Sequence, residues 1–338
     1  MTGEDRPVLA IVGPTASGKT ALSIRVAEVL QGEVISMDSR QIFRGMDIGT
    51  AKATREERAR VPHHGLDIVD PREHYSAARF AEDARRWIEG IRGRDRWPLL
   101  VGGTGFFLKA LTDPVFEEPP IDRKRRARLR TWFEGRSKAE LAPWVERLDP
   151  ERAEVALAGG IHRIARTLEV ALLTGRPLSW WHRNAPPVAP PLRPLIFRLA
   201  LPREELYGRI NRRARAMFDS GLVAEVAELL EAGVPRDAPS MTGTGYREAA
   251  EVLEGSLSVE EAIDRVQRVT RRYARRQETW FRHQLPEEGV EVIDASLLLE
   301  DQLRQVLLRL KRWSAGGTGG ARDGVGGQKS NPPPGEST

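Results

Sequence analysis

The first third of the chain alternates short apolar runs with longer amphipathic stretches. Short apolar runs bounded by glycine or turn residues are typical of buried strands, whereas apolar residues at every third or fourth position are typical of helices. This alternation predicts βαβ units and a parallel sheet covered by helices on both faces. The expected strands are residues 8–12, 32–37 and 97–101, and the expected helices are residues 19–30 and 77–91.

The middle of the chain has a different pattern. Residues 122–174 are charged, follow helical spacing and contain no run that resembles a strand. A proline-rich stretch at 185–191 separates them from a new apolar run at 195–199. We therefore expect a helical insertion domain, residues 117–193, within the α/β unit.

The C-terminal part returns to the α/β pattern, with helices expected at 205–233 and 258–283 and one more short strand at 289–293. The last residues are rich in Gly, Ser and Pro and have almost no apolar side chains, which is typical of disorder. The division that we expect is an α/β core of residues 1–116 and 194–312, the insertion 117–193, and a disordered tail 313–338.

The composition agrees with a globular protein. The chain has 338 residues, of which 40% are hydrophobic and 30% charged, as in soluble domains. No apolar run approaches the roughly 18 residues that a membrane span needs, and the first residues lack the pattern of a signal peptide. Cysteine is absent, which excludes disulfides, a cysteine-based zinc finger and a cysteine nucleophile. We therefore expect a cytoplasmic protein without contact to membranes.

The net charge of +5 is too small to identify a partner, so the distribution of charge matters more. Most basic residues are arginines, which suit contacts to phosphates and bases; a GC-rich genome would also enrich arginine. Within 264–283, arginines recur at helical spacing, with apolar and aromatic residues interleaved. This pattern fits either a solvated helix over an ordinary core or a surface that binds RNA. The arginines are Arg265, Arg268, Arg272, Arg275 and Arg276.

A glycine-rich loop between the first expected strand and helix has the spacing of a Walker A motif. Its glycines let backbone N–H groups converge on phosphate oxygens, and the helix adds its positive N-terminal end. Lys19 supplies a point charge, and the Thr20 hydroxyl can ligate Mg²⁺. The residues expected to bind a diphosphate are Gly13, Pro14, Thr15, Ala16, Ser17, Gly18, Lys19 and Thr20. This motif predicts a core like that of P-loop NTPases.

An ATPase usually has a second apolar strand that ends in a carboxylate, which holds magnesium. The best matching strand in this chain has no carboxylate at its end. The run at 97–101 continues into Gly102-Gly103-Thr104-Gly105, whereas Asp38 follows the run at 32–37. Asp38 alone could cap a loop, and Thr104 alone is more often structural. Because the carboxyl ends of parallel strands meet at one edge of a sheet, we expect Asp38, Thr104 and the P-loop to form one site.

In order along residues 8–285, these motifs resemble those of bacterial tRNA dimethylallyltransferases. The P-loop is followed by Asp-Ser-Arg-Gln and by Gly-Gly-Thr-Gly, a specific combination. Further matching stretches are 47–52, 63–68, 75–80, 162–170, 245–248 and 275–282. Departures are Phe106 and Phe107 where Leu-Tyr is usual, Thr167 for a common alanine, and Thr244 for an apolar residue.

The resemblance implies transfer of a dimethylallyl group from dimethylallyl diphosphate to N6 of adenosine 37, beside the tRNA anticodon. The P-loop would then hold a leaving group rather than ATP. By the same resemblance, Asp38 is the general base toward the amine and Thr104 assists at the diphosphate bridge or the amine. Arg213 aligns with an arginine that contacts the diphosphate.

The resemblance also implies a set of residues that bind tRNA. They lie after the expected strand ends, in the insertion, in the Gly-Tyr-Arg segment and on the basic C-terminal helix. The set is Asp38, Ser39, Arg40, Gln41, Thr104, Arg126, His162, Arg163, Ile164, Ala165, Arg166, Gly245, Tyr246, Arg247, Arg275, Arg276, Gln277, Trp280 and Arg282.

Two other functions remain open from the residues alone: a nucleotide-dependent kinase of small molecules, and an RNA-binding protein with an inactive P-loop. His63 and His64 could suggest a metal, but two histidines without a third ligand are a weak signal. Trp180 and Trp181 are expected to pack within the insertion. We expect a monomer.

Overall fold

A computed structural model describes residues 6–113, 121–185, 189–286 and 289–316. Its centre is a six-stranded parallel sheet in the order β3-β2-β4-β1-β5-β6. The expected parallel sheet is therefore confirmed, and β3, a strand of two residues, is an addition. The strands are β1 (Leu9–Val12), β2 (Gly32–Ser36), β3 (His63–His64), β4 (Trp97–Gly102), β5 (Leu195–Ala200) and β6 (Val290–Asp294).

Alternating side chains of β1 point to two separate cores, one on each face of the sheet. Leu9 and Ile11 pack with the first core, and Ala10 and Val12 pack with the second. All four are fully buried, as expected for a central strand covered on both sides. The first core is completed by α1 (Lys19–Leu30), α10 (Arg203–Asp219) and α14 (Leu299–Gly316), and the second by α3 (Ala77–Gly93), α4 (Gly105–Thr112) and α13 (Val259–Gln284).

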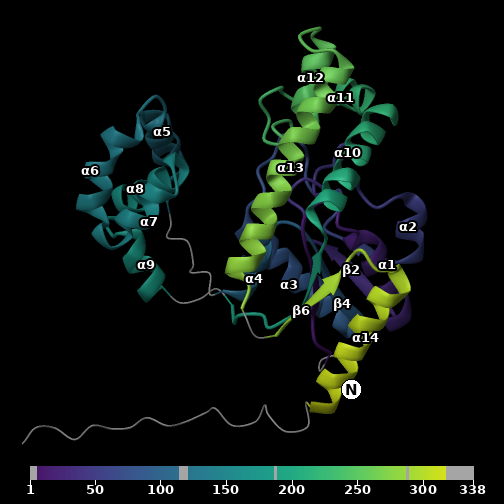
Figure 1. Ribbon diagram of the computed structural model, residues 1–338. Coiled ribbons are helices and arrows are strands. Elements are labelled where there is room, and N and C mark those ends of the chain that lie inside the picture. Colours follow the sequence, from purple (N-terminus) through teal and green to yellow (C-terminus); the bar gives the residue numbers. More distant parts are fainter. Residues whose placement is uncertain (1–5, 114–120, 186–188, 287–288, 317–338) are drawn as a thin grey trace, which may run out of the picture.

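Beyond the sheet, α10 and α13 continue into an arm that also contains α11 (Leu222–Glu231) and α12 (Tyr246–Leu253) (Figure 1). This arm has its own apolar core. The single helix expected at 205–233 is wrong: Gly221 has φ 100° and starts α11 as a separate helix. A residue with a side chain is strained at that φ, so glycine permits the chain to turn there.

The insertion is a small bundle of helices with a separate core around Leu141, Ile164 and Leu168 (Figure 1). Trp181 of the insertion is half-buried, and its indole N–H donates to Thr174 Oγ1 at 3.1 Å. The helices are α5 (Arg123–Phe133), α6 (Lys138–Leu148), α7 (Ala153–Ala158), α8 (Ile161–Thr174) and α9 (Leu178–Asn184), with a 3-10 turn at Pro150–Arg152.

The C-terminal helix α14 ends at Gly316, three residues beyond the expected start of the tail at 313. Residues 317–338 lie outside the described part of the chain. The remaining short helix is α2 (Arg55–Arg60). In the described part, no helix is long and apolar enough to cross a membrane.

Candidate active site

The P-loop joins β1 to α1 and is held open by unusual backbone angles. Gly13, Ala16 and Gly18 have φ values of 152°, 63° and 93°. A Cβ atom on Gly13 would lie 3.0 Å from the Leu199 carbonyl oxygen of the neighbouring strand. The Lys19 ammonium donates to the carbonyl oxygens of Gly13 and Pro14, at 3.0 and 2.7 Å, and so lies across the loop.

Two cations meet at this loop. Lys19 is only partly exposed, and burial lowers its pKa to about 7, with a further decrease from the nearby Arg213 guanidinium and an opposing increase from Asp38. Burial also lowers the pKa of Arg213, and Asp38 opposes that shift. The negative charge around the two cations is therefore too small to balance their positive charge. A bound polyanion such as a diphosphate would supply it.

Asp38 and Thr104 lie at adjacent strand ends, as expected. Asp38 Oδ1 accepts from the Arg40 backbone N–H at 2.8 Å. Thr104 N donates to the Met37 carbonyl at 3.2 Å, and Thr104 Oγ1 accepts from Ser39 N at 3.2 Å. The Gly-Gly-Thr-Gly loop is thus fastened to the end of β2. The Thr104 hydroxyl hydrogen is not used in that bond.

Two cavities meet at Asp38. The first has a volume of about 420 Å³ and is lined by the P-loop, including Thr20. The second has a volume of about 350 Å³ and is lined by the loops 49–50 and 242–244 and by apolar residues of the arm. Both are lined by Asp38, Arg213 and Tyr273. This arrangement has room for an anionic group on one side of Asp38 and a second substrate on the other.

Comparison with known proteins places this site in a family. The IPP transferase family model matches residues 41–284, and an isopentenyl transferase model matches residues 6–63. The chain belongs to the IPP transferase family. A tRNA dimethylallyltransferase of Thermomicrobium roseum is 44% identical over 91% of this chain and 92% of its own length. One of Roseiflexus sp. is 44% identical over 91% and 98%.

Solved structures of this family agree with the fold. The full-length tRNA isopentenylpyrophosphate transferase of Bacillus halodurans has a TM-score of 0.65 and 37% identity, covering 91% of this chain and 96% of its own. A eukaryotic dimethylallyltransferase acting on tRNA has a TM-score of 0.77 and 26% identity, covering 92% and 79%. The P-loop NTPase-like core expected from the sequence is that of these IPP transferases.

Several positions that the IPP transferase resemblance assigned to tRNA instead tie the site together. Gln277 of α13 is 7% exposed. Its Oε1 accepts from Thr15 N of the P-loop at 2.8 Å, and its Nε2 donates to the Gly103 carbonyl at 2.9 Å. A Cβ atom on Gly103 would lie 2.3 Å from Gln277 Nε2, which explains the glycine. Gln277 therefore links the P-loop to the Gly-Gly-Thr-Gly loop, and its side chain is buried.

Arg40 and Gln41 also connect loops. Arg40 Nη1 donates to the Pro239 carbonyl at 2.6 Å. Gln41 Nε2 donates to the carbonyls of Thr50 and Ala51, both at 3.2 Å. Arg40 still lines the second cavity and Gln41 the first. Their expected contacts with tRNA stay predictions, but both side chains have a structural role already.

Two residues of the predicted tRNA-binding set have their side chains inside the protein. Tyr246 is 1% exposed, and its hydroxyl donates to Glu225 Oε1 at 2.5 Å. Ile164 is 0% exposed and belongs to the core of the insertion. The family resemblance put both in motifs that are expected to bind tRNA, but motif membership does not show which side chains of each motif turn inward. Gly245 begins α12 with φ 98°, and Arg247 beside it is exposed.

The other predicted tRNA positions lie on two surfaces. On α13, a groove of about 690 Å³ is lined by Arg275, Arg276 and Trp280; Arg282 is exposed on the same helix. The Trp280 ring packs on Gly105, where a Cβ atom would lie 2.3 Å from it. This contact joins the groove to the Gly-Gly-Thr-Gly loop.

In the insertion, three arginines surround one buried carboxylate. Arg126, Arg130 and Arg166 form ion pairs with Glu169 at 2.7–3.0 Å. The Glu169 carboxylate is 4% exposed, and although burial alone would raise its pKa, Arg126 and Arg130 hold the pKa below its usual value. His162 and Arg163 are exposed on the same helix as Glu169, and Ala165 packs against the core.

The two histidines of β3 have protein partners. His63 Nδ1 lies 2.7 Å from the Val61 carbonyl, and His64 Nε2 lies 2.7 Å from Glu33 Oε2. Among the described residues, no group of three or more His, Asp or Glu side chains is placed to hold a metal ion.

Proposed function

We propose that this protein is a tRNA dimethylallyltransferase, which moves the dimethylallyl group of dimethylallyl diphosphate to N6 of adenosine 37 beside the anticodon. The observation that carries this proposal is the meeting of two cavities at Asp38 and Arg213. One cavity has the P-loop cations, and the other has the Asp38 carboxylate at its boundary and a lining of both polar and apolar side chains. Membership of the IPP transferase family supports the same reaction.

In the first cavity, the P-loop binds the diphosphate as a leaving group. The bond between the allylic C1 and the bridging oxygen breaks, so negative charge grows on the diphosphate. Lys19, Arg213 and the N-terminal end of α1 lie where this charge develops, which stabilises the transition state more than the ground state. Apolar side chains around the allyl group exclude water from the cation-like carbon.

In the second cavity, Asp38 accepts a hydrogen bond from the adenine amine. As N6 forms its bond to C1, the amine loses one proton, which Asp38 takes as general base. The Thr104 hydroxyl, fixed through Ser39 N, donates to the diphosphate bridge or orients the amine. Holding the amine and C1 in line supplies a large share of the rate.

Mg²⁺ fits the donor set of the first cavity. Thr20 is exposed at the start of α1 and lines the cavity, and Mg²⁺ prefers a few protein oxygens together with phosphate oxygens and waters. Thr20 would hold the ion beside the diphosphate. When bound, the ion supplies positive charge for the leaving group.

The acceptor surface consists of the α13 groove and the insertion. An adenine amine is hidden in stacked RNA, so the enzyme must take the base out of the anticodon loop. Arg275, Arg276 and Trp280 offer cations and a ring for that loop, and we assign the insertion arginines to contacts with the stem. Because tRNA is the proposed acceptor, we place the protein in the cytoplasm. Because one chain carries both cavities, we propose that a monomer is active.

The test is direct. The purified protein is incubated with Mg²⁺, radiolabelled dimethylallyl diphosphate and a transcribed tRNA with adenosine at position 37, and the digested nucleosides are separated. We expect labelled N6-isopentenyladenosine, and none from a tRNA with guanosine at that position. RNA that stays unlabelled, together with hydrolysis of ATP in a parallel reaction to which ATP is added, would refute the proposal in favour of a kinase.

A further inference from the structure

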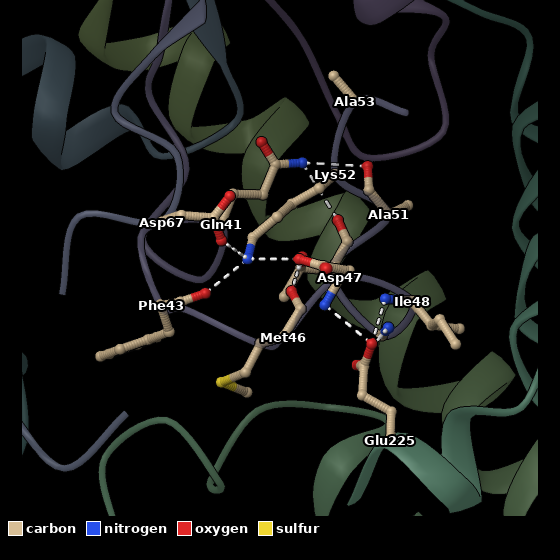
Figure 2. A network of polar contacts seen from close by, with 12 residues as sticks. Gln41, Phe43, Met46, Asp47, Ile48, Ala51, Lys52, Ala53, Asp67 and Glu225 are labelled. Carbon is tan, nitrogen blue, oxygen red and sulfur yellow. Dashed lines mark hydrogen bonds and ion pairs between the residues drawn. The ribbon is translucent and has the colours of Figure 1, made fainter. Parts of the chain in front are cut away.

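One carboxylate outside the reaction cavities accepts hydrogen bonds from the backbone of a loop that lines these cavities. Glu225, on α11, accepts hydrogen bonds from the backbone N–H groups of Asp47 and Ile48 at 2.9 and 2.7 Å on Oε2, and from Gly49 at 3.3 Å on Oε1 (Figure 2). A carboxylate that accepts several backbone N–H groups forms strong, charge-assisted bonds and fixes their direction.

The fourth donor to this carboxylate is the Tyr246 hydroxyl, at 2.5 Å from Oε1. Burial and the Glu225 charge raise the pKa of Tyr246 well above its usual value, so the phenol remains a donor. The Tyr246 ring also lies against Gly49, where a Cβ atom would be 2.4 Å from the ring. Each oxygen of Glu225 therefore has two donors, and Gly49 has no space for a side chain.

The opposite side of the same loop is held by Lys52. Its ammonium donates to the Phe43 carbonyl at 2.5 Å and pairs with Asp47 and Asp67 at 2.8 and 2.6 Å (Figure 2). Its side chain is 1% exposed. Segment 47–52 is thus held by the Glu225 carboxylate at its first residues and by the Lys52 ammonium at its last residue.

This loop is connected to the diphosphate site through one carbonyl. Arg213 Nη2 donates to the Thr50 carbonyl at 3.4 Å, and Gly49 and Thr50 line the second cavity together with Asp38 and Arg213. Arg213 is on α10, which is followed directly by α11 with Glu225. Two consecutive helices therefore contact the same loop from two points.

We propose that Glu225, with Tyr246 as its donor, is a positioning residue that sets the place of Arg213 at the diphosphate through segment 47–50. The inference rests on the proposed function, since it concerns the substrate that Arg213 binds there. Glu225 does not line the cavities, so its effect passes through the Thr50 carbonyl.

The test compares Glu225→Gln with the wild type, using Glu228→Gln as the control on an exposed face of the same helix. In Glu225→Gln an amide NH₂ faces backbone donors, so bonds to a charged acceptor are lost, which corresponds to about a tenfold weakening or more. We expect the KM for dimethylallyl diphosphate at saturating tRNA to rise about tenfold. The KM for tRNA and all values of Glu228→Gln should stay within about twofold.

Two further variants separate positioning from general destabilisation. Tyr246→Phe removes one hydroxyl and should raise the same KM by a smaller factor, even if Glu225→Gln does not fold. In an Arg213→Lys background, Glu225→Gln should add less than about twofold, because the group through which it acts is already changed.

Equal increases in both KM values would overturn the inference, as would full additivity with Arg213→Lys. An unchanged KM for the diphosphate in Tyr246→Phe and Glu225→Gln would overturn it too. These outcomes are distinct from failure of the proposed function, which would appear as no labelled product from the wild-type protein.

Discussion

Replacing Gln277 by Ala should loosen both substrate-binding loops at once. The side chain joins Thr15 N to the Gly103 carbonyl, two groups that lie 262 and 174 residues away in sequence. Without it, one backbone donor and one backbone acceptor lose their partner. An unsatisfied buried polar group costs about 1–3 kcal/mol. Because water in the cavity can reach part of this region, we expect the free energy of unfolding to fall by about 2–4 kcal/mol.

The assay is denaturant unfolding followed by tryptophan fluorescence, together with the KM for dimethylallyl diphosphate. The matched control is Gln284→Ala, the same change at an exposed position of the same helix, which should stay within about 0.5 kcal/mol of the wild type. Gln277→Glu separates the two bonds: a carboxylate oxygen still accepts from Thr15 N, but its other oxygen faces the Gly103 carbonyl. If Gln277→Ala has the same free energy of unfolding as Gln284→Ala and an unchanged KM for dimethylallyl diphosphate, Gln277 does not hold the two loops together.

The other predictions concern the site itself. Asp38→Asn should lower kcat by a factor of about 10²–10⁴ while tRNA affinity, measured by filter binding, changes less than about twofold; an equal loss of affinity would make Asp38 structural. The diphosphate should bind the charged form of Lys19, whose pKa is about 7 in the empty site. Below that pH the ammonium is already charged and affinity is constant, whereas above it binding must take up a proton, so the KM for the diphosphate should rise with pH, by up to about tenfold per unit. A KM that is flat between pH 6 and 9 would contradict this. Gly105→Ala should displace Trp280 and weaken tRNA binding more than diphosphate binding, which parallel titrations of the two substrates would show.

The sheet and the P-loop could be predicted because their signals are local. Strand β1 is a buried apolar run that ends in the glycine of the loop, and α1 was expected with the same bounds that the structure gives, Lys19–Leu30. The meeting of Asp38 with Thr104 was also predictable, because parallel strands present their carboxyl ends at one edge. These statements need only the order of elements along the chain.

The roles of Gln277, Tyr246 and Glu225 were not predictable in this way. Each depends on a contact between distant segments, and motif membership does not say which side of a loop faces inward. Gln277 and Trp280 are neighbours on α13, yet the first is buried and the second lines a groove. The break at Gly221 was missed because apolar spacing continues across it, and only the backbone angle reveals the turn.

Several polar side chains around the site share one physical arrangement, in which they hold backbone rather than substrate. Glu225 and Lys52 together fix segment 47–52, as Gln277 fixes the P-loop and Gly103. Lys19 and Arg213 differ, because burial lowers the pKa of both cations and the nearby Asp38 carboxylate opposes that shift only in part. A folded protein keeps such cations partly uncompensated only at a cost in stability. The diphosphate removes that cost when it binds, so this substrate should stabilise the protein by RT ln(1 + [L]/Kd), with [L] its free concentration.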